Sequence, residues 1–193
     1  SYHGIVDQVK VAAGEWVAIH GCGGIGLAPT QIANALGASV IAVDINPKSL
    51  EVARKMGAVH TVDASKDNPG EAIKELTGGG AHVSVDALGI ATTCLNSIMS
   101  LRKRGRHLQI GLTTQAEKGF VSLPVDLIVA MELQFVGTIG MQPRRYSSML
   151  NMVESGKLRP GEMVTSVLPI EKASEVIQSM GSYGVVGTTV IKW

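Results

Sequence analysis

The sequence has few cysteines, few aromatic residues and little net charge, and each shortage excludes a class of protein. Two cysteines in 193 residues, Cys22 and Cys94, cannot form a disulfide framework, and they lack the CxxC spacing of a zinc site. Aromatic residues make up only 4%, which argues against platforms that stack nucleic-acid bases. A net charge of +1 gives no electrostatic reason for nucleic acid or an acidic membrane to bind. We therefore expect a reduced, cytoplasmic protein with neither of these partners.

Apolar residues and glycine are abundant instead. Apolar residues make up 45% of the chain, and 23 glycines point to many tight turns around one sizeable core. The longest uncharged run, Trp16–Val43, contains Pro29 and several glycines, so we expect strand, turn, helix and strand there and not a membrane span. The chain opens on Ser1 with a short amphipathic helical stretch, and we expect it to be part of a longer protein.

Short β-rich runs alternate with helical stretches of about ten residues along most of the chain. Strands are predicted over Trp16–Gly21, Ser39–Asp44, Ala58–Asp63, His82–Leu88, Arg106–Leu112 and Leu133–Gly140. Helices are predicted between them over Ile25–Leu36, Pro47–Met56, Asn68–Leu76 and Thr92–Leu101. This alternation predicts an α/β fold, a Rossmann doubly wound six-stranded parallel sheet with the strand order 3-2-1-4-5-6.

The pattern changes after Gly140. It predicts helix, strand, helix and strand over Arg144–Glu154, Met163–Ile170, Glu171–Met180 and Val186–Trp193. We therefore expect a Rossmann domain over residues 1–140 and a C-terminal extension over residues 141–193.

The stretch HGCGGIG, His20–Gly26, has the composition of a phosphate-binding loop. Gly21, Gly23 and Gly26 fit the spacing GxGxxG between a predicted strand and a predicted helix. The second strand ends in Asp44, and the distance from position 26 to position 44 is 18 residues. A glycine loop in this context, followed by an acid at this distance, is the dinucleotide-binding fingerprint.

Each of these residues has a separate physical role in such a site. Gly21 permits a sharp turn, Gly23 lets a pyrophosphate approach the backbone, and Gly26 lets the helix pack closely on the sheet. The N–H groups at the helix start attract phosphate. Asp44 accepts hydrogen bonds from the ribose hydroxyls and repels a 2′-phosphate, which favours NAD over NADP. The alternative is a turn without a ligand, in which Asp44 only caps a helix.

The segment VAAGEWVAIHGCGGIGLAPTQIANALGASVIAVDINPKSLEVARKMGA resembles the zinc-dependent alcohol dehydrogenases of the medium-chain dehydrogenase/reductase superfamily. GAHVSVDALG, GRHLQIGL, FVGTIG and SYGVVGTTVIKW extend the resemblance over the whole chain. It implies the coenzyme-binding portion of an enzyme that passes a hydride between a small alcohol or aldehyde and NAD.

The resemblance also implies which residues contact the cofactor. The adenine and phosphate half includes, besides the three glycines and Asp44, the residues Cys22, Gly24, Ile25, Ile45 and Lys48. The nicotinamide half is implied to lie against Ala87, Leu88, Gly89, Ile110, Gly111, Leu112, Gly137, Thr138 and Ile139.

The chain departs from the family pattern in three respects. Ser49, with Lys48 beside it, stands where close relatives of the horse-liver type carry a basic residue. Gly187 aligns with an arginine that meets the pyrophosphate. The zinc ligands and the proton relay belong to an N-terminal domain that this sequence does not contain. We therefore expect no catalytic residue and no metal ligand in this chain.

Three other functions remain open. The chain could be a stand-alone dinucleotide-binding module without chemistry of its own. It could belong to an NADPH quinone reductase of the same superfamily, although such enzymes lack an acid equivalent to Asp44. A methyltransferase could also use a glycine-rich loop with a second-strand acid. The resemblance further implies a homodimer through the sixth strand, Leu133–Gly140.

Several reactive residue types have simpler explanations. His20 closes a strand and is expected to be packed, whereas His3 is a weaker candidate for contact with cofactor or substrate. Cys22 lies at a helix start, where a thiolate can be activated, but its small size is the preferred explanation. The basic run Arg102–Arg106 is expected at a helix C-terminus, where cations complement the helix dipole.

Overall fold

The structure, a computed structural model, describes residues 1–179 and 186–193. Its main sheet is parallel throughout and has the order β3-β2-β1-β4-β5-β6. The strands are β1 Trp16–His20, β2 Ser39–Asp44, β3 Ala58–Asp63, β4 Ala81–Asp86, β5 Leu101–Gln109 and β6 Gln134–Gly137. The doubly wound sheet predicted from the sequence is confirmed.

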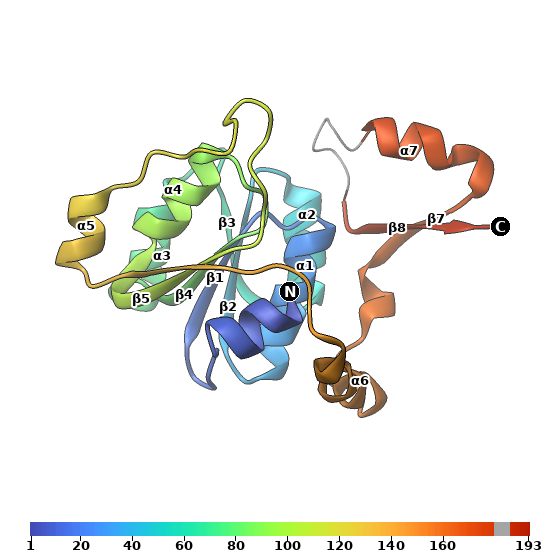
Figure 1. Ribbon diagram of the computed structural model, residues 1–193, viewed down its shortest axis with the longest axis horizontal. Helices are drawn as coiled ribbons and strands as arrows, with labels where there is room; N and C mark the ends of the chain where they lie inside the picture. Colours follow the sequence, from blue (N-terminus) through green and yellow to red (C-terminus); the bar gives the residue numbers. More distant parts are fainter. Residues whose placement is uncertain (180–185) are drawn as a thin grey trace.

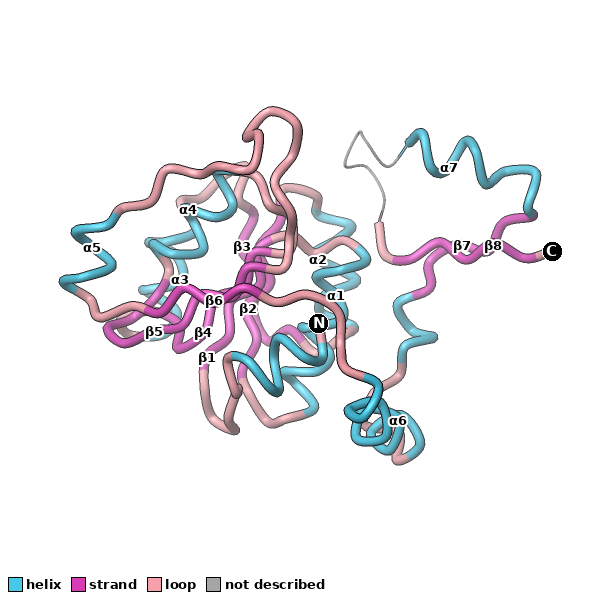
Figure 2. The backbone as a smooth tube through the Cα atoms, in the orientation of Figure 1, coloured by secondary structure: helices cyan, strands magenta, loops and turns pink. Residues whose placement is uncertain are grey.

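Helices cover both faces of this sheet (Figure 2). Those of the sheet domain are α1 Gly24–Ala35, α2 Pro47–Lys55, α3 Pro69–Thr77, α4 Ala91–Met99 and α5 Val125–Ala130, after a π-helix over His3–Gln8. Successive side chains of β1 face the helix layers on opposite sides of the sheet. Val17 and Ile19 pack in a cluster with α1 and α2, whereas Ala18 packs in a second cluster with Ile73 of α3.

Local sequence explains where the helices begin and end. The side chains of Asn46 and Asn68 accept hydrogen bonds from the first turns of α2 and α3, at 3.0 and 3.2 Å. A proline follows each asparagine at the first helical position, where a missing N–H costs nothing. Gly78 closes α3 with a left-handed φ of +65°.

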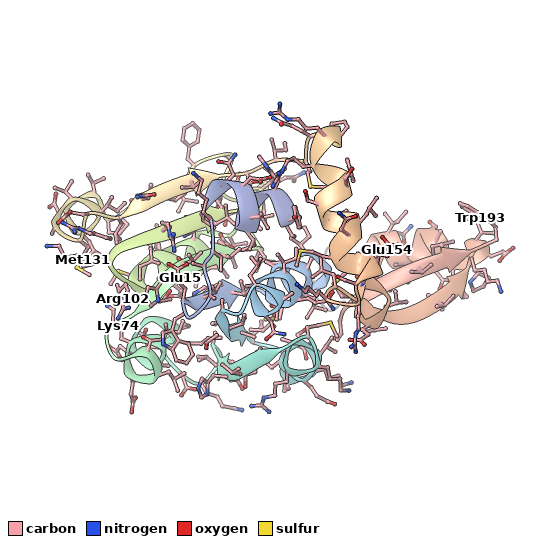
Figure 3. The ribbon with its side chains drawn as sticks, turned by 90° about the horizontal axis from the view of Figure 1, so that it is seen from below. Glu15, Lys74, Arg102, Met131, Glu154 and Trp193 are labelled. Carbon is pink, nitrogen blue, oxygen red and sulfur yellow. The ribbon has the colours of Figure 1, made fainter. Side chains whose placement is uncertain are left out.

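The placement of the basic run Arg102–Arg106 at a helix C-terminus is wrong. Helix α4 ends at Met99, and the run lies on β5, which begins at the buried Leu101. Long-range partners hold the run in the strand. Arg102 lies 2.6 Å from Nε2 of His82, and Arg106 forms an ion pair with Glu15. Figure 3 labels Arg102 and Glu15 at the same end of the molecule.

The chain after β6 continues beside the main sheet (Figure 1). Helix α6 Tyr146–Glu154 leads to a parallel pair of strands, β7 Val164–Pro169 and β8 Thr188–Lys192, with α7 Ala173–Ser179 between them. Short 3₁₀ turns precede α6, β7 and α7 over Pro143–Arg145, Pro160–Met163 and Ile170–Lys172. The end of the predicted helix Glu171–Met180 falls outside the described residues.

Several contacts attach this extension to the rest of the fold, among them an ion pair between Arg145 and Asp7 at 2.6 Å. The side chain of Gln31 on α1 bonds both backbone groups of Arg159, at 2.7 and 3.2 Å. Gly187, just before β8, forms an isolated parallel bridge to Gly23. Trp193 projects at the far end of the molecule from Met131 (Figure 3) and is 95% exposed. The division between domains at residue 140 stays a prediction.

Candidate functional site

A cleft of about 580 Å³ lies at the carboxyl ends of β1, β2 and β4. Ligands bind in parallel sheets of this kind at the point where the strand order reverses, and here that point lies between β1 and β4. The lining residues are Gly21, Gly23, Gly24, Ile25, Gly26, Asp44, Ile45, Ser49, Ala87, Leu88, Ile90, Gly187, Thr188 and Thr189.

The glycine loop has the geometry that its spacing predicts. Gly21 has a φ of +88°, and its N–H donates to the Val43 carbonyl at 2.9 Å. A Cβ atom on Gly26 would collide with the backbone carbonyl of Gly21, so α1 can approach β1 closely only with glycine there. No described atom lies within 4 Å of a Cβ built on Gly23, which leaves open space above the start of α1.

Helix α1 begins at this open space without a side-chain cap. Gly23 is its N-cap and supplies no side-chain hydrogen bond to the first turn. The helix has twelve residues, so its first N–H groups and its dipole favour an anion at this end. A phosphate that approaches Gly23 would meet the backbone at the start of α1, with Thr188 beside it.

Asp44 ends β2 at the rim of the same cleft. Its Oδ2 accepts a hydrogen bond from the backbone N–H of Cys22 at 2.7 Å, and its Oδ1 accepts one from Asn46 at 2.8 Å. Ile45 beside it is 67% exposed. Asp44 therefore keeps a carboxylate at the cleft and also fixes the glycine loop to the end of β2.

Cys22 lies under the loop and does not line the cleft. Its thiol is fully buried and donates to the Val43 carbonyl at 3.5 Å. Burial raises the pKa of this thiol far above its ordinary value, and the Asp44 carboxylate raises it further. These contacts favour a small packed residue over an activated thiolate.

The residues predicted for the nicotinamide half gather at neighbouring strand ends. Ala87 and Leu88 line the cleft, whereas Gly89, Ile110–Leu112 and Gly137–Ile139 lie beyond its lining. The N–H groups of Ile110 and Gly111 both donate to the Asp86 carbonyl at 3.0 Å, and Thr138 donates to Gln109 at 3.2 Å. The loops after β4, β5 and β6 therefore run side by side.

Several lining residues are not among those that the sequence predicts to contact the cofactor. These are Ser49, Ile90, Thr188, Thr189 and Gly187, the last of which was noted only for its missing arginine. Lys48, which is predicted to contact the cofactor, is not among the lining residues. Local spacing contains no information about the Gly23–Gly187 contact, because the two residues are far apart in the chain.

The histidines do not form a metal site among the described residues. No group of three histidine, cysteine, aspartate or glutamate side chains there could hold a metal ion. His20 is buried, and burial, with His107 nearby, lowers its pKa to about 3, which confirms the packed interpretation. His3 pairs with Asp7 at 2.9 Å. Within the described part of the chain, no helix combines the length and apolar character needed to cross a bilayer.

A family model described as zinc-binding dehydrogenase matches residues 24–155. A NAD-dependent alcohol dehydrogenase of Sulfurisphaera tokodaii is 31% identical over 177 residues, which cover 91% of this chain and 49% of the relative. A probable D-xylulose reductase A of Emericella nidulans is 31% identical over 182 residues, with coverages of 91% and 50%. The chain thus spans about half the length of the curated relatives it matches.

Solved structures agree with these matches. A crystal structure of a NAD-dependent alcohol dehydrogenase superposes with a TM-score of 0.89 at 29% identity, over 100% of this chain and 55% of the other. The alcohol dehydrogenase TADH from Thermus sp. ATN1 gives a TM-score of 0.85 at 25% identity, with coverages of 95% and 53%. The chain belongs to the zinc-binding dehydrogenase family and corresponds to its coenzyme-binding portion.

Proposed function

We propose that this chain binds NAD(H) and orients it for hydride transfer to or from a small alcohol or aldehyde. The observation that carries the proposal is the open space at Gly23, which faces the start of α1 in the same cleft as Asp44. A pyrophosphate fits the first feature, and a ribose diol fits the second. The NAD-dependent alcohol dehydrogenases among the relatives support the same assignment.

In the proposed complex, the adenine half lies over the glycine loop. Residues Gly21–Gly26 receive the pyrophosphate, with Cys22 contributing backbone only. Asp44 accepts bonds from the adenosine ribose, Ile45 covers the adenine, and Lys48 approaches from the first turn of α2. A 2′-phosphate would place two negative charges beside the Asp44 carboxylate, so NADH is preferred over NADPH. This preference argues against an NADPH quinone reductase.

The nicotinamide half lies along the three neighbouring strand ends. The proposed contacts are Ala87, Leu88, Gly89, Ile110, Gly111, Leu112, Gly137, Thr138 and Ile139. When bound, the nicotinamide ring supplies the hydride chemistry. The protein's part is to hold the ring at the carboxyl edge of the sheet and to exclude water from one of its sides.

In this proposal, zinc is bound by other parts of the complete enzyme and not by this chain. The described residues of this chain do not fit a zinc ion, because they bring no three suitable ligands together. The chain's own role is therefore coenzyme binding, and a stand-alone binding module is the alternative for the isolated chain. We also propose a reducing, cytoplasmic setting, which suits the two buried free thiols.

We further propose that two copies pair through β6. This strand contacts β5 on one side and forms the edge of the six-stranded sheet. Phe135 on β6 is 46% exposed, and Val125 and Val129 on the adjacent α5 are 62% and 71% exposed. An unpaired strand edge beside exposed apolar side chains favours pairing with a second copy.

Equilibrium dialysis of the 193-residue chain against radiolabelled NAD+ and ADP-ribose tests the function. ADP-ribose carries the adenine, both riboses and the pyrophosphate, so it isolates the half of the site formed by the glycine loop and Asp44. We expect saturable binding of both ligands with one site per chain. If neither ligand bound saturably, the proposed function would be contradicted.

A further inference from the structure

Gln109, the last residue of β5, connects two of the proposed nicotinamide loops through one amide nitrogen. Its Nε2 lies 2.9 Å from Oδ2 of Asp86 and 2.8 Å from the Gly111 carbonyl oxygen. Asp86 ends β4, and Gly111 follows β5, so a single side chain joins the ends of adjacent strands. Both partners of Nε2, the Asp86 carboxylate and the Gly111 carbonyl, are hydrogen-bond acceptors.

This arrangement fixes the orientation of the Gln109 amide. A carboxylate and a backbone carbonyl are acceptors only, so the nitrogen must face them and use both of its hydrogens. The oxygen Oε1 then lies 2.9 Å from Nε2 of His107 and accepts a hydrogen bond from its N–H group. The other ring nitrogen of His107 lies 2.9 Å from the Ser97 hydroxyl on α4, which donates to it.

Asp86 is the anchor of this network and is completely buried. Its Oδ1 accepts hydrogen bonds from the N–H groups of Leu88 and Gly89, each at 3.0 Å, and from the Thr93 hydroxyl at 2.9 Å. A buried carboxylate requires such partners, because removing one leaves charge poorly solvated. The loop after β4 is therefore held by one Asp86 oxygen, and Gln109 is held by the other.

The two connected loops also interlock through glycine. A Cβ atom on Gly111 would collide with the backbone of Leu88, and one on Gly89 would collide with the backbone of Leu112. The two loops are therefore packed backbone against backbone. The Phe135 ring on β6 lies 4.5 Å from the His107 ring, between ring centroids, which supports the network from the third strand.

From these contacts we infer that Gln109 is a positioning residue for the nicotinamide end of the cofactor. It acts through Asp86 and Gly111 and does not itself touch the ring. Without its bridge, the loops after β4 and β5 keep their backbone contacts but lose the side-chain link between them, and the surface under the ring is less well fixed. The adenine half, built by α1 and β2, does not depend on this bridge. The inference rests on the proposed NAD(H) function.

The test compares two ligands on two variants of the 193-residue chain. Gln109→Met preserves length and removes the hydrogen bonds. Gln31→Met is the control, because the Gln31 amide also forms two hydrogen bonds, here to both backbone groups of Arg159 and away from the loops after β4 and β5. Calorimetry measures affinity for NADH and for ADP-ribose, which lacks nicotinamide, and circular dichroism confirms folding.

We expect Gln109→Met to weaken NADH on the order of tenfold and to change ADP-ribose less than about twofold. Gln31→Met should leave the ratio of the two affinities unchanged. If Gln109→Met does not fold, Gln109→Asn makes the same test, because its amide is one methylene too short to reach both partners.

The other outcomes distinguish failure of the Gln109 role from failure of the proposed NAD(H) function. Equal loss of both ligands, or no loss of either, overturns the positioning role of Gln109 while the NAD(H) function stands. Wild-type protein that binds ADP-ribose as tightly as NADH also overturns it, because the ring would then not be held by this chain. Wild-type protein that binds neither ligand overturns both.

Discussion

The Asp44 carboxylate accepts a hydrogen bond from the backbone N–H of Cys22 at 2.7 Å. The acid that ends the second strand thus fixes the loop that follows the first strand. Its other oxygen accepts from Asn46 at 2.8 Å, so the carboxylate also fixes the entry to α2. The group proposed to select the ribose is therefore held on both sides by backbone donors before any ligand arrives.

Asp44→Asn should reduce the preference for NADH over NADPH by about tenfold or more. The amide keeps an oxygen for one backbone donor but removes the charge that would repel a 2′-phosphate. Parallel titrations of the variant with both cofactors measure this ratio. An unchanged ratio, with NADH still bound, would show that Asp44 does not select the cofactor.

Gly23→Ala and Gly26→Ala should separate ligand binding from stability. The space beside Gly23 is open, so alanine there should change the free energy of unfolding by about 1 kcal/mol or less. The same methyl group would occupy the space proposed for the pyrophosphate, so NADH affinity should fall at least about tenfold.

Gly26→Ala should instead destabilise the fold by about 3 kcal/mol or more, because its Cβ would collide with the Gly21 carbonyl. Urea denaturation and NADH titration of the two variants make the comparison. Normal NADH binding by Gly23→Ala would contradict the placement of the pyrophosphate.

Stability should fall as the pH is lowered from 6.5 toward 5. Burial lowers the pKa of His20 to about 3, and burial also lowers the pKa of His107. Between about pH 6.5 and the folded pKa, the unfolded chain binds protons that the folded chain refuses, so acid favours unfolding. For His20 the expected loss is about 2 kcal/mol at pH 5 relative to pH 7.5.

Urea denaturation at pH 7.5, 6.0 and 5.0 measures this loss for wild type and for His20→Gln. At pH 7.5, where His20 is neutral in both the folded and the unfolded protein, the difference in the free energy of unfolding between the two proteins gives the cost of the changed packing. His20→Gln should then lose less stability on acidification than wild type. Identical pH dependence in both proteins would contradict the assignment to His20.

Both thiols should resist alkylation in the native protein. Burial raises the pKa of Cys22 strongly, and burial, followed by the Asp86 charge, raises the pKa of Cys94 to about 11. Iodoacetamide labelling at pH 8, followed by mass spectrometry, should be slow with or without NAD. Urea-unfolded protein should label at both positions. Rapid labelling of Cys22 in the native protein that is blocked by NAD would contradict this prediction. It would show instead that Cys22 is a reactive residue in the phosphate loop.

The proposed pairing through β6 predicts a dimer at high protein concentration. Phe135→Lys places a charge at the exposed strand edge and should shift the protein toward monomer. Light scattering over a concentration series measures the mass of both proteins. A purely monomeric wild type at the highest concentration would contradict the pairing.

The bounds of two strands were predictable because local residues set their limits. Ser39–Asp44 and Ala58–Asp63 are observed with the predicted bounds, since glycine precedes each apolar run and an acid ends it. The GxGxxG spacing and Asp44 predicted where the cleft lies, because those residues carry their physical reasons within one βαβ unit.

What could not be predicted depends on contacts between distant residues. β5 begins earlier than expected because the buried Leu101 pairs with Ala81 of β4. Helix α5 was not predicted, and none of its residues is buried. The Gly23–Gly187 bridge and the Gln109 bridge join strand ends through geometry that no local pattern contains.

Calorimetric titration of the wild-type chain with NADH and, in parallel, with NADPH tests the central claim most directly. The account predicts one NADH site per chain and NADPH binding at least about tenfold weaker, because Asp44 faces the ribose. Equal affinity for the two cofactors, or tighter binding of NADPH, would contradict the role of Asp44. Binding of neither cofactor would contradict the proposal that the glycine loop and the cleft form a working coenzyme site in this chain.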